Sequence, residues 1–128
     1  MTILTFANGK RFVGNRPWAD VILEPTYIPT PNTHKCLVDT GADYLLLPAS
    51  ARKGAGLLAR PTTIHTSKTA GGVATFDLMT GVEVEIEGYT VTIDVLFDPK
   101  NAATPLAGRN LLLAAFEIGF QSSDWHWT

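Results

Sequence analysis

A single carboxylate, Asp39, lies between two apolar runs and is followed directly by a hydroxyl and a glycine, in the segment Cys36-Leu-Val-Asp-Thr-Gly-Ala-Asp-Tyr-Leu-Leu-Leu47. A carboxylate in such surroundings can transfer protons, but it is costly to bury unless it is hydrogen-bonded. Gly41 allows the backbone to turn sharply enough to aim its amides at the Asp39 side chain. We therefore expect Asp39 to lie at a strand end inside the protein. The alternative is an ordinary Asp-Thr-Gly turn, which the flanking apolar runs disfavour.

Three histidines and one cysteine offer other chemistry, but their spacing favours none of it. His34, His65 and His126 show no metal-ligand spacing, so we expect no metal site and no other cofactor. His34 and Cys36 lie two residues apart and would share one face of a strand. Because the sequence shows no third group to orient them, cysteine catalysis is the weakest enzymatic alternative.

Three segments in a fixed order point to one protein family. They are Leu37-Val-Asp-Thr-Gly-Ala-Asp43, Thr69-Ala-Gly-Gly-Val73 and Leu106-Ala-Gly-Arg-Asn-Leu-Leu112. Together they resemble the active-site loop, the flap tip and the strand-to-helix segment of the retropepsin-like aspartic proteases, over a stretch from Arg16 to Phe120. The resemblance implies an all-β, closed β-barrel acid-protease fold. We expect one domain over residues 1–128, with a flap hairpin and one short C-terminal helix.

Carboxylate-driven hydrolysis of a peptide bond needs two carboxyl groups, because one must hold a proton while the other accepts one from water. The sequence contains one Asp-Thr-Gly. We therefore infer an aspartic endopeptidase that acts as a twofold homodimer, in which two Asp39 carboxyls hold the attacking water between them. The pair would titrate as a unit and work best at mildly acidic pH. A retropepsin-like module that dimerises or binds peptides without turnover is the alternative.

The resemblance also implies roles for the neighbours of Asp39. Thr40, Gly41 and Ala42 would support the active site, with Thr40 bridging backbone groups across the dimer axis. Asp43 would form a structural ion pair with Arg109 and would also face the main chain of the substrate. The alternative is an exposed Asp43 and an exposed Arg109, which the apolar surroundings disfavour, since a charge there needs a partner.

The resemblance further implies that a glycine-rich hairpin tip binds the substrate. Its backbone could approach a peptide closely because it carries small side chains. The residues of this predicted tip are Ala70, Gly71, Gly72 and Val73. From the glycines alone, an ordinary hairpin turn is the alternative.

Short runs of β-branched and aromatic residues, separated by Gly and Pro, predict a mostly-β fold that positions these groups. Val82–Glu87 and Thr90–Phe97 alternate apolar and polar residues on either side of a turn near Gly88, which predicts two paired strands. We also predict a strand over Trp18–Leu23 and a hairpin that joins Thr2–Phe6 to Arg11–Val13 through Asn8-Gly9. A loop is expected over Pro25–Thr33 and an extended tail over Trp125–Trp127. The predicted helices are one over Leu111–Phe116, capped by Asn110, and a weaker stretch over Ala49–Leu58.

Composition excludes several classes of protein. The 128 residues are 45% hydrophobic and 17% charged, which excludes a disordered chain, and the net charge of −2 lacks the basic character of a nucleic-acid binder. The longest apolar run, Leu111–Phe116, is far shorter than the ~20 residues of a membrane span. The amino terminus lacks a signal-peptide pattern, so we expect a cytoplasmic protein. The low charge suggests a surface covered by a partner, and we expect the tail Trp125–Thr128 and the strand Thr2–Phe6 to form much of the dimer contact.

Overall fold

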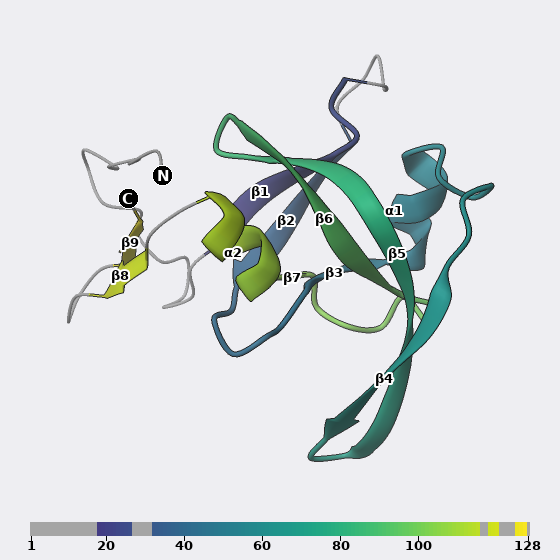
Figure 1. Ribbon diagram of the computed structural model, residues 1–128. Helices are drawn as coiled ribbons and strands as arrows, with labels where there is room; N and C mark the ends of the chain where they lie inside the picture. The colour runs from purple at the N-terminus through teal and green to yellow at the C-terminus, as the bar shows by residue number, and fades with distance from the viewer. Residues whose placement is uncertain (1–17, 27–31, 116–117, 121–124, 128) are drawn as a thin grey trace.

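The computed structural model describes residues 18–26, 32–115, 118–120 and 125–127. Its elements follow one another in the order β1 (Trp18–Leu23), β2 (Asn32–Val38), β3 (Leu45–Pro48), α1 (Ala49–Gly54), β4 (Thr63–Thr69), β5 (Gly72–Ile86), β6 (Tyr89–Asp98), β7 (Leu106–Ala107), α2 (Arg109–Ala115), β8 (Ile118–Phe120) and β9 (Trp125–Trp127) (Figure 1). Strands dominate, which confirms the all-β prediction. Among these described residues, no helix has the length and apolar character to cross a membrane.

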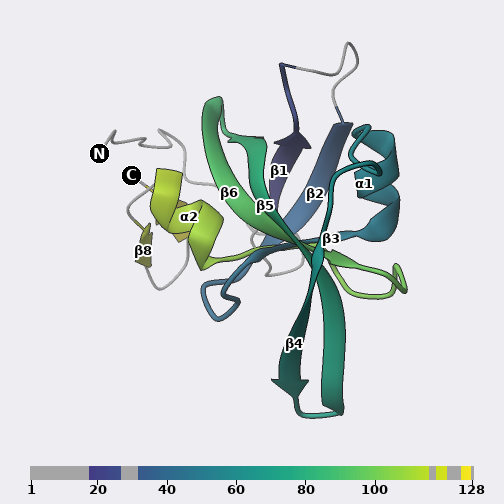
Figure 2. The same ribbon diagram turned by 45° about the vertical axis from the view of Figure 1, so that its right-hand side comes forward.

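Seven strands form one sheet in the spatial order β1-β2-β7-β3-β6-β5-β4. Because β1 also pairs with β5, the sheet closes on itself and leaves β4 outside the closed part. The pairs β2–β7 and β3–β6 are parallel, and the other pairs of this sheet are antiparallel. Figure 2 shows the long β4–β5 hairpin projecting away from the closed part. The predicted closed barrel is confirmed.

The core fills the interior of the closed sheet. Val82, Val84 and Ile86 of β5 are fully buried, whereas Glu83 and Glu85 between them are partly exposed. This is the period of two that a half-buried strand requires. The other large buried side chains come from the strands and from α2 and include Leu23, Leu45, Leu47, Met79, Phe97, Leu111 and Leu112. Each contributes about 1.5–3 kcal/mol by leaving water, so the core supplies most of the free energy that keeps the barrel closed.

The clearest strand predictions agree with the structure. Strand β1 has the predicted bounds Trp18–Leu23, and the run Thr90–Phe97 lies within β6. The run Val82–Glu87 lies in β5 except for Glu87, because β5 ends at Ile86. Their turn consists of Glu87 and Gly88, which have positive φ values of 49° and 81°. Two consecutive residues with positive φ match the twist of the strands that a two-residue hairpin turn joins.

Strand β5 is much longer than the alternation predicts, because it also forms one side of the projecting hairpin. Its pairing with β6 shifts register between Met79 and Val82. Gly81 in this bulge has a φ of 66°, which a residue with a side chain adopts at a cost. The bulge separates the barrel part of β5 from the hairpin part.

The first helix is shorter than predicted. It ends at Gly54 and not at Leu58, and Ala55 is its C-cap residue. Gly56 has a φ of 70°, and glycine in this left-handed conformation ends helices because it lacks a Cβ.

The second helix begins at Arg109, so the prediction that Asn110 caps it is wrong. The carbonyl of Gly108 accepts hydrogen bonds from the amides of Leu111 and Leu112, which makes Gly108 the capping position. The Asn110 side chain contacts other elements, as described below.

Some predictions fall at the edges of the described residues. The predicted hairpin of Thr2–Phe6 and Arg11–Val13 lies outside them. The predicted loop Pro25–Thr33 is partly described, and its last two residues belong to β2. The predicted extended tail is β9, which pairs antiparallel with β8 in a separate two-stranded sheet.

Candidate active site

Asp39 is the first residue after β2, at the point where this strand leaves the barrel. Its backbone amide donates to the carbonyl of Ala107 in β7 at 3.0 Å, which continues the parallel β2–β7 pairing by one bond. One carboxylate oxygen, Oδ1, accepts a hydrogen bond from the Gly41 amide at 2.9 Å. A second bond, from the Ala42 amide to the Asp39 carbonyl at 3.2 Å, closes the turn. The loop therefore holds the carboxylate through its own backbone.

The predicted strand-end position of Asp39 is correct, but the side chain is only half-buried in the single chain. Thr40 and Ala42 are also half-buried, and Gly41 is exposed. The loop lies at the surface of one chain because β2 ends there, so the expected location inside the protein is wrong for the chain by itself.

The loop is fastened to α2 by main-chain and side-chain bonds. The amides of Arg109 and Asn110 donate to the carbonyls of Ala42 and Asp43 at 2.8 and 3.1 Å. The Asn110 side chain accepts from the Leu45 amide at 2.8 Å through Oδ1. Its Nδ2 donates to the carbonyl of Asp94 in β6 at 2.6 Å. Asn110 thus joins the loop, α2 and β6, a role that sequence reasoning missed because it read this residue as a helix cap.

The structure brings Asp43 and Arg109 together. The Arg109 guanidinium donates to the Asp43 carboxylate and forms an ion pair with it. Both side chains are largely open to solvent, with exposed fractions of 52% for Arg109 and 68% for Asp43. In one chain, solvent screening therefore limits what this pair contributes to stability.

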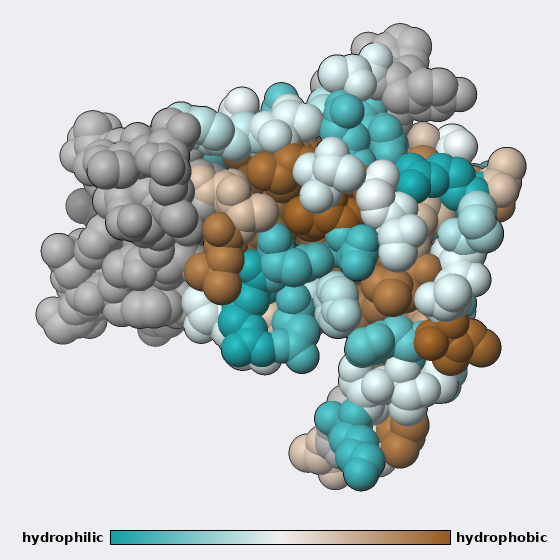
Figure 3. All heavy atoms as spheres, viewed as in Figure 1, coloured by the Kyte–Doolittle hydropathy of each residue, from teal (hydrophilic) through white to brown (hydrophobic). Residues whose placement is uncertain are grey.

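The predicted tip of the β4–β5 hairpin lies at the end of the projecting ribbon. Thr69 pairs with Gly72 across Ala70 and Gly71, and Gly72 has a φ of 121°. The four predicted tip residues, Ala70 to Val73, are all exposed. Figure 3 shows the hairpin standing away from the body of the protein, with the surface hollowed between them.

A cavity of about 380 Å³ lies between the Asp39 loop and the hairpin. Such a volume is in the range of small-ligand sites. The loop contributes Gly41, Ala42, Asp43 and Tyr44, the hairpin contributes His65, Ser67, Lys68 and Phe76, and the floor is formed by Leu46, Leu96 and Leu106. The predicted tip residues do not line it, and neither does Asp39. Val73 and Lys100 line a second cavity of about 340 Å³.

Sequence reasoning missed the hairpin residues that form this wall. The rings of Tyr44 and His65 pack edge to face with centroids 5.1 Å apart and an interplanar angle of 71°, which joins the loop to β4. Because β4 alternates, His65 and Ser67 share a face of the strand. Apolar alternation does not mark this face, because Ile64, the large apolar residue of β4, lies on the opposite face and is 77% exposed.

Residues 30–113 match a family model described as gag-polyprotein putative aspartyl protease. The chain belongs to this aspartyl protease family. The matched residues include the Asp39 loop, the β4–β5 hairpin and the start of α2. They form most of the retropepsin-like fold. No curated protein matches the chain closely enough to count as a relative.

In this aspartyl protease domain, Cys36 and His34 do not line the cavity. Cys36 is fully buried in β2, where burial and the nearby Asp20 charge raise the pKa of its thiol to about 12. A thiol with so high a pKa carries little thiolate and is a poor nucleophile. Burial also lowers the pKa of His34. Within the described part of the chain, no three His, Cys, Asp or Glu side chains are grouped as metal ligands would be.

Proposed function

We propose that this protein is an aspartic endopeptidase that acts as a homodimer of single-domain chains. The observation that carries the proposal is the Asp39-Thr40-Gly41 loop, whose backbone holds the Asp39 carboxylate beside the cavity of an aspartyl protease domain. The chain has one such loop, so a second carboxyl has to come from a second copy. A twofold axis would set the two loops face to face.

The proposed reaction uses the two Asp39 carboxyls as a general acid and a general base. Two negative charges at short distance repel each other, so one carboxyl carries a proton while the other is ionised. The ionised carboxyl accepts a proton from water as the water oxygen attacks the peptide carbonyl carbon. The other carboxyl donates its proton to the carbonyl oxygen, which gives a tetrahedral diol. As the C–N bond breaks, the first carboxyl returns its proton to the leaving nitrogen and the second accepts a hydroxyl proton from the diol, so the pair is restored. The half-exposed position of Asp39 supports this arrangement, because a second loop can reach it.

The peptide substrate is proposed to lie between the Asp39 loop and the β4–β5 hairpin. Exposed backbone at the glycine-containing tip can hydrogen-bond an extended main chain. The cavity has an apolar floor of Leu46, Leu96 and Leu106 and a polar rim, so it suits one apolar side chain of the substrate.

The decisive experiment measures cleavage of a peptide library at roughly pH 4 to 6, the range expected for a carboxyl pair. We expect the wild-type chain to cleave and Asp39→Asn to lose at least about a hundredfold in rate, since the amide cannot exchange protons. Asp20→Asn, an exposed Asp on β1, is the matched control and should leave the rate unchanged. Sedimentation of the active protein should give twice the chain mass of 13.8 kDa.

Two results would contradict the proposal. One is the absence of cleavage by the wild-type dimer, which would favour a module that dimerises or binds peptides without turnover. The other is equal cleavage by Asp39→Asn. A statine-type peptide, whose hydroxyl mimics the tetrahedral intermediate, should inhibit the wild-type chain and provides a second measure of the same site.

A further inference from the structure

The β4–β5 hairpin is weakly supported by the rest of the sheet. In the described part of the sheet, β4 is an edge strand whose partner is β5. Residues Gly72–Leu78 of β5 pair with β4, and of these Asp77 and Leu78 also pair with β6. A two-stranded ribbon is only marginally stable by itself. The position of β4, which forms one wall of the cavity, therefore depends on how its base is held.

Backbone pairing between β4 and β5 stops at the base of the hairpin. The β4–β5 ladder ends where Thr63 pairs with Leu78. Continuing the same register would set Pro61 opposite Thr80 and Arg60 opposite Gly81. Pro61 has no N–H to donate, and the β5 bulge lies at this level. The Arg60 amide donates to the Leu57 carbonyl instead, so β4 supplies no backbone donor to the carbonyls of Thr80 and Gly81.

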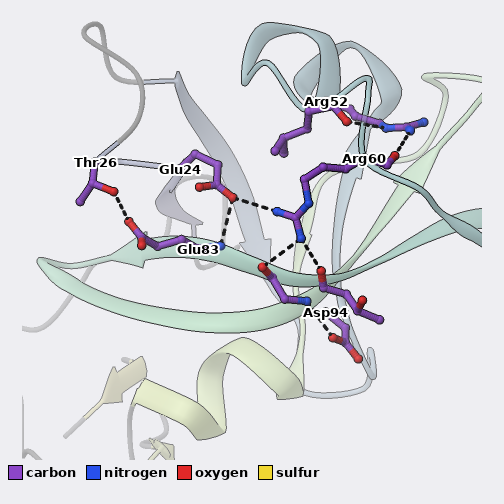
Figure 4. Close-up of polar contacts among 9 residues, drawn as sticks. Glu24, Thr26, Arg52, Arg60, Glu83 and Asp94 are labelled. Atoms are coloured by element: carbon purple, nitrogen blue, oxygen red, sulfur yellow. Dashed lines mark hydrogen bonds and ion pairs between the residues drawn. The ribbon is translucent and has the colours of Figure 1, made fainter.

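The Arg60 side chain supplies a donor instead. Its Nη2 donates to the carbonyl oxygens of Thr80 and Gly81 at 2.6 and 3.1 Å, and its Nη1 to Glu24 Oε1 at 3.4 Å (Figure 4). A planar guanidinium can make these bonds at once, whereas an ammonium group would make fewer of them in this geometry. Arg52 Nη2 donates in turn to the Arg60 carbonyl at 2.7 Å, which fixes the backbone from which the side chain extends.

The groups that Arg60 contacts are themselves anchored in the barrel. Glu24 Oε1 also accepts from the Glu83 amide at 3.3 Å, and the Glu24 amide donates to the Glu83 carbonyl at 2.8 Å. These bonds lie where β1 closes the barrel on β5. On the other side of the bulge, the Gly81 amide donates to Asp94 Oδ1 of β6 at 3.3 Å. Arg60 thus joins the base of the hairpin to a bulge that is held from two sides.

We propose that Arg60 is a positioning residue of the protease: it clamps the base of β4 to the β5 bulge and so holds the β4 wall of the substrate cavity in place. This inference rests on the proposed function. Arg60 does not line the cavity, whereas His65, Ser67 and Lys68 of β4 do. Without the clamp, substrate binding must order the ribbon, and that entropic cost appears in the affinity for peptide. The Asp39 loop has separate supports in β7 and α2, so the chemical step is unaffected.

The test compares Arg60→Met with the wild-type chain in two measurements. Amide hydrogen exchange should become about tenfold faster in the hairpin residues 63–76 and stay unchanged in β2 and β3, as expected when one charge-assisted bond cluster is lost locally. The KM for a cleaved peptide should rise about tenfold while kcat changes less than about twofold. Lys53→Met, which removes an exposed positive charge from α1, is the matched control and should change neither quantity.

A variant that retains the charge separates geometry from electrostatics. Arg60→Lys should show an intermediate change in both measurements, because it keeps the Glu24 pair at most and loses the fork. Arg60→Lys also provides the test if Arg60→Met fails to fold.

The proposal is overturned if Arg60→Met leaves hairpin exchange and KM unchanged. It is also overturned if exchange accelerates equally in the barrel strands, or if both variants unfold, since Arg60 would then support the whole fold. Failure of the proposed function gives a different result. The wild-type chain would then not cleave peptides, while amide hydrogen exchange in the hairpin would still show whether the clamp exists.

Discussion

Gly108 lies where the start of α2 meets the loop that carries Asp39. A Cβ atom at this position would overlap the carbonyl oxygen of Tyr44 and lie 2.6 Å from its carbonyl carbon. The backbone on both sides is hydrogen-bonded, with the Arg109 amide on the Ala42 carbonyl. Neither segment can withdraw without breaking these bonds, so only glycine fits.

We predict that Gly108→Ala destabilises the fold by about 3 kcal/mol or more, because relief of the overlap must displace backbone. Thermal or urea unfolding measures the loss. Gly54→Ala is the control: its Cβ would lie 3.4 Å from the Asn32 amide nitrogen, an ordinary contact, and its stability should stay within about 0.5 kcal/mol of wild type. Equal stabilities of the two variants would contradict the structure.

Asp98 is a buried carboxylate at the end of β6, 5% exposed. Burial by itself tends to raise the pKa of Asp98. This effect is outweighed by hydrogen bonds from the amides of Ala103, Lys100 and Ala102 and by the Lys100 charge, so the pKa lies below its usual value. These bonds measure 2.8, 3.0 and 2.8 Å respectively. They shape the loop that leads into β7, on which Asp39 rests.

We predict that Asp98→Asn costs about 1–3 kcal/mol at pH 6, because the amide nitrogen cannot accept the bonds that a carboxylate oxygen accepts. A lowered folded-state pKa gives stability that is present above the unfolded value of 3.8 and is lost as pH falls through the folded value. The difference between wild type and variant should therefore shrink below about pH 4. Melting curves from pH 3 to 7 test it; a difference that does not depend on pH would show that the charge contributes nothing.

At the scale of elements, the loop after β2 is supported by β7 on one side and by α2 on the other. The Asp43–Arg109 ion pair adds a side-chain link between the loop and α2, parallel to the main-chain bonds from Arg109 and Asn110. Since both charged groups are well exposed, the link is worth less than about 1 kcal/mol to one chain. It would gain strength if a second chain of the proposed dimer excluded water from it.

We predict that Arg109→Ala lowers the stability of the isolated chain by less than about 1 kcal/mol but raises the dimer dissociation constant at least about fivefold, since pairing strengthens as water is excluded. Unfolding at low concentration measures the first quantity and sedimentation the second. Lys53→Ala removes a comparable exposed charge from α1 and should alter neither. Unchanged melting and sedimentation of Arg109→Ala would contradict the proposal that this pair supports the assembly.

On the whole molecule, sparse charge and a few exposed apolar side chains are compatible with the proposed dimer. Leu58, Ile64, Val73 and Leu113 are each more than half exposed. The strands β8 and β9 form their own small sheet, apart from the barrel sheet (Figure 1). Such a sheet has edges that further strands can join.

We predict that deletion of Trp125–Thr128 weakens the proposed dimer at least about tenfold, because it removes β9 and two tryptophans, a residue type that interfaces favour. Analytical ultracentrifugation over a concentration series measures the dissociation constant. Deletion of Thr128 alone is the control. An unchanged constant in the longer deletion would place the dimer contact elsewhere.

Local sequence patterns predicted a large part of the fold. The bounds of β1, the β5–β6 turn and the loop after β2 agree with prediction because each depends on neighbouring residues: alternation, positive φ at Glu87 and Gly88, and an Asp followed by Gly. The prediction failed for Asn110, whose amide bonds atoms 16 and 65 residues away. A prediction of helix caps considers only partners close in sequence, so it cannot find such bonds.

The carboxylate loop and the alternating strands were predictable because they depend on residue types at short spacing, and the single Asp-Thr-Gly led to the proposal of a second copy. The residues that form the cavity and the contacts that hold the hairpin follow from the tertiary fold. Closure of β1 on β5 and the register of β4 bring Arg60 to Thr80 and Gly81, and His65 to Tyr44. These contacts arise from how strands distant in sequence pair, and pairing is settled by the burial of the shared core, which no short segment contains.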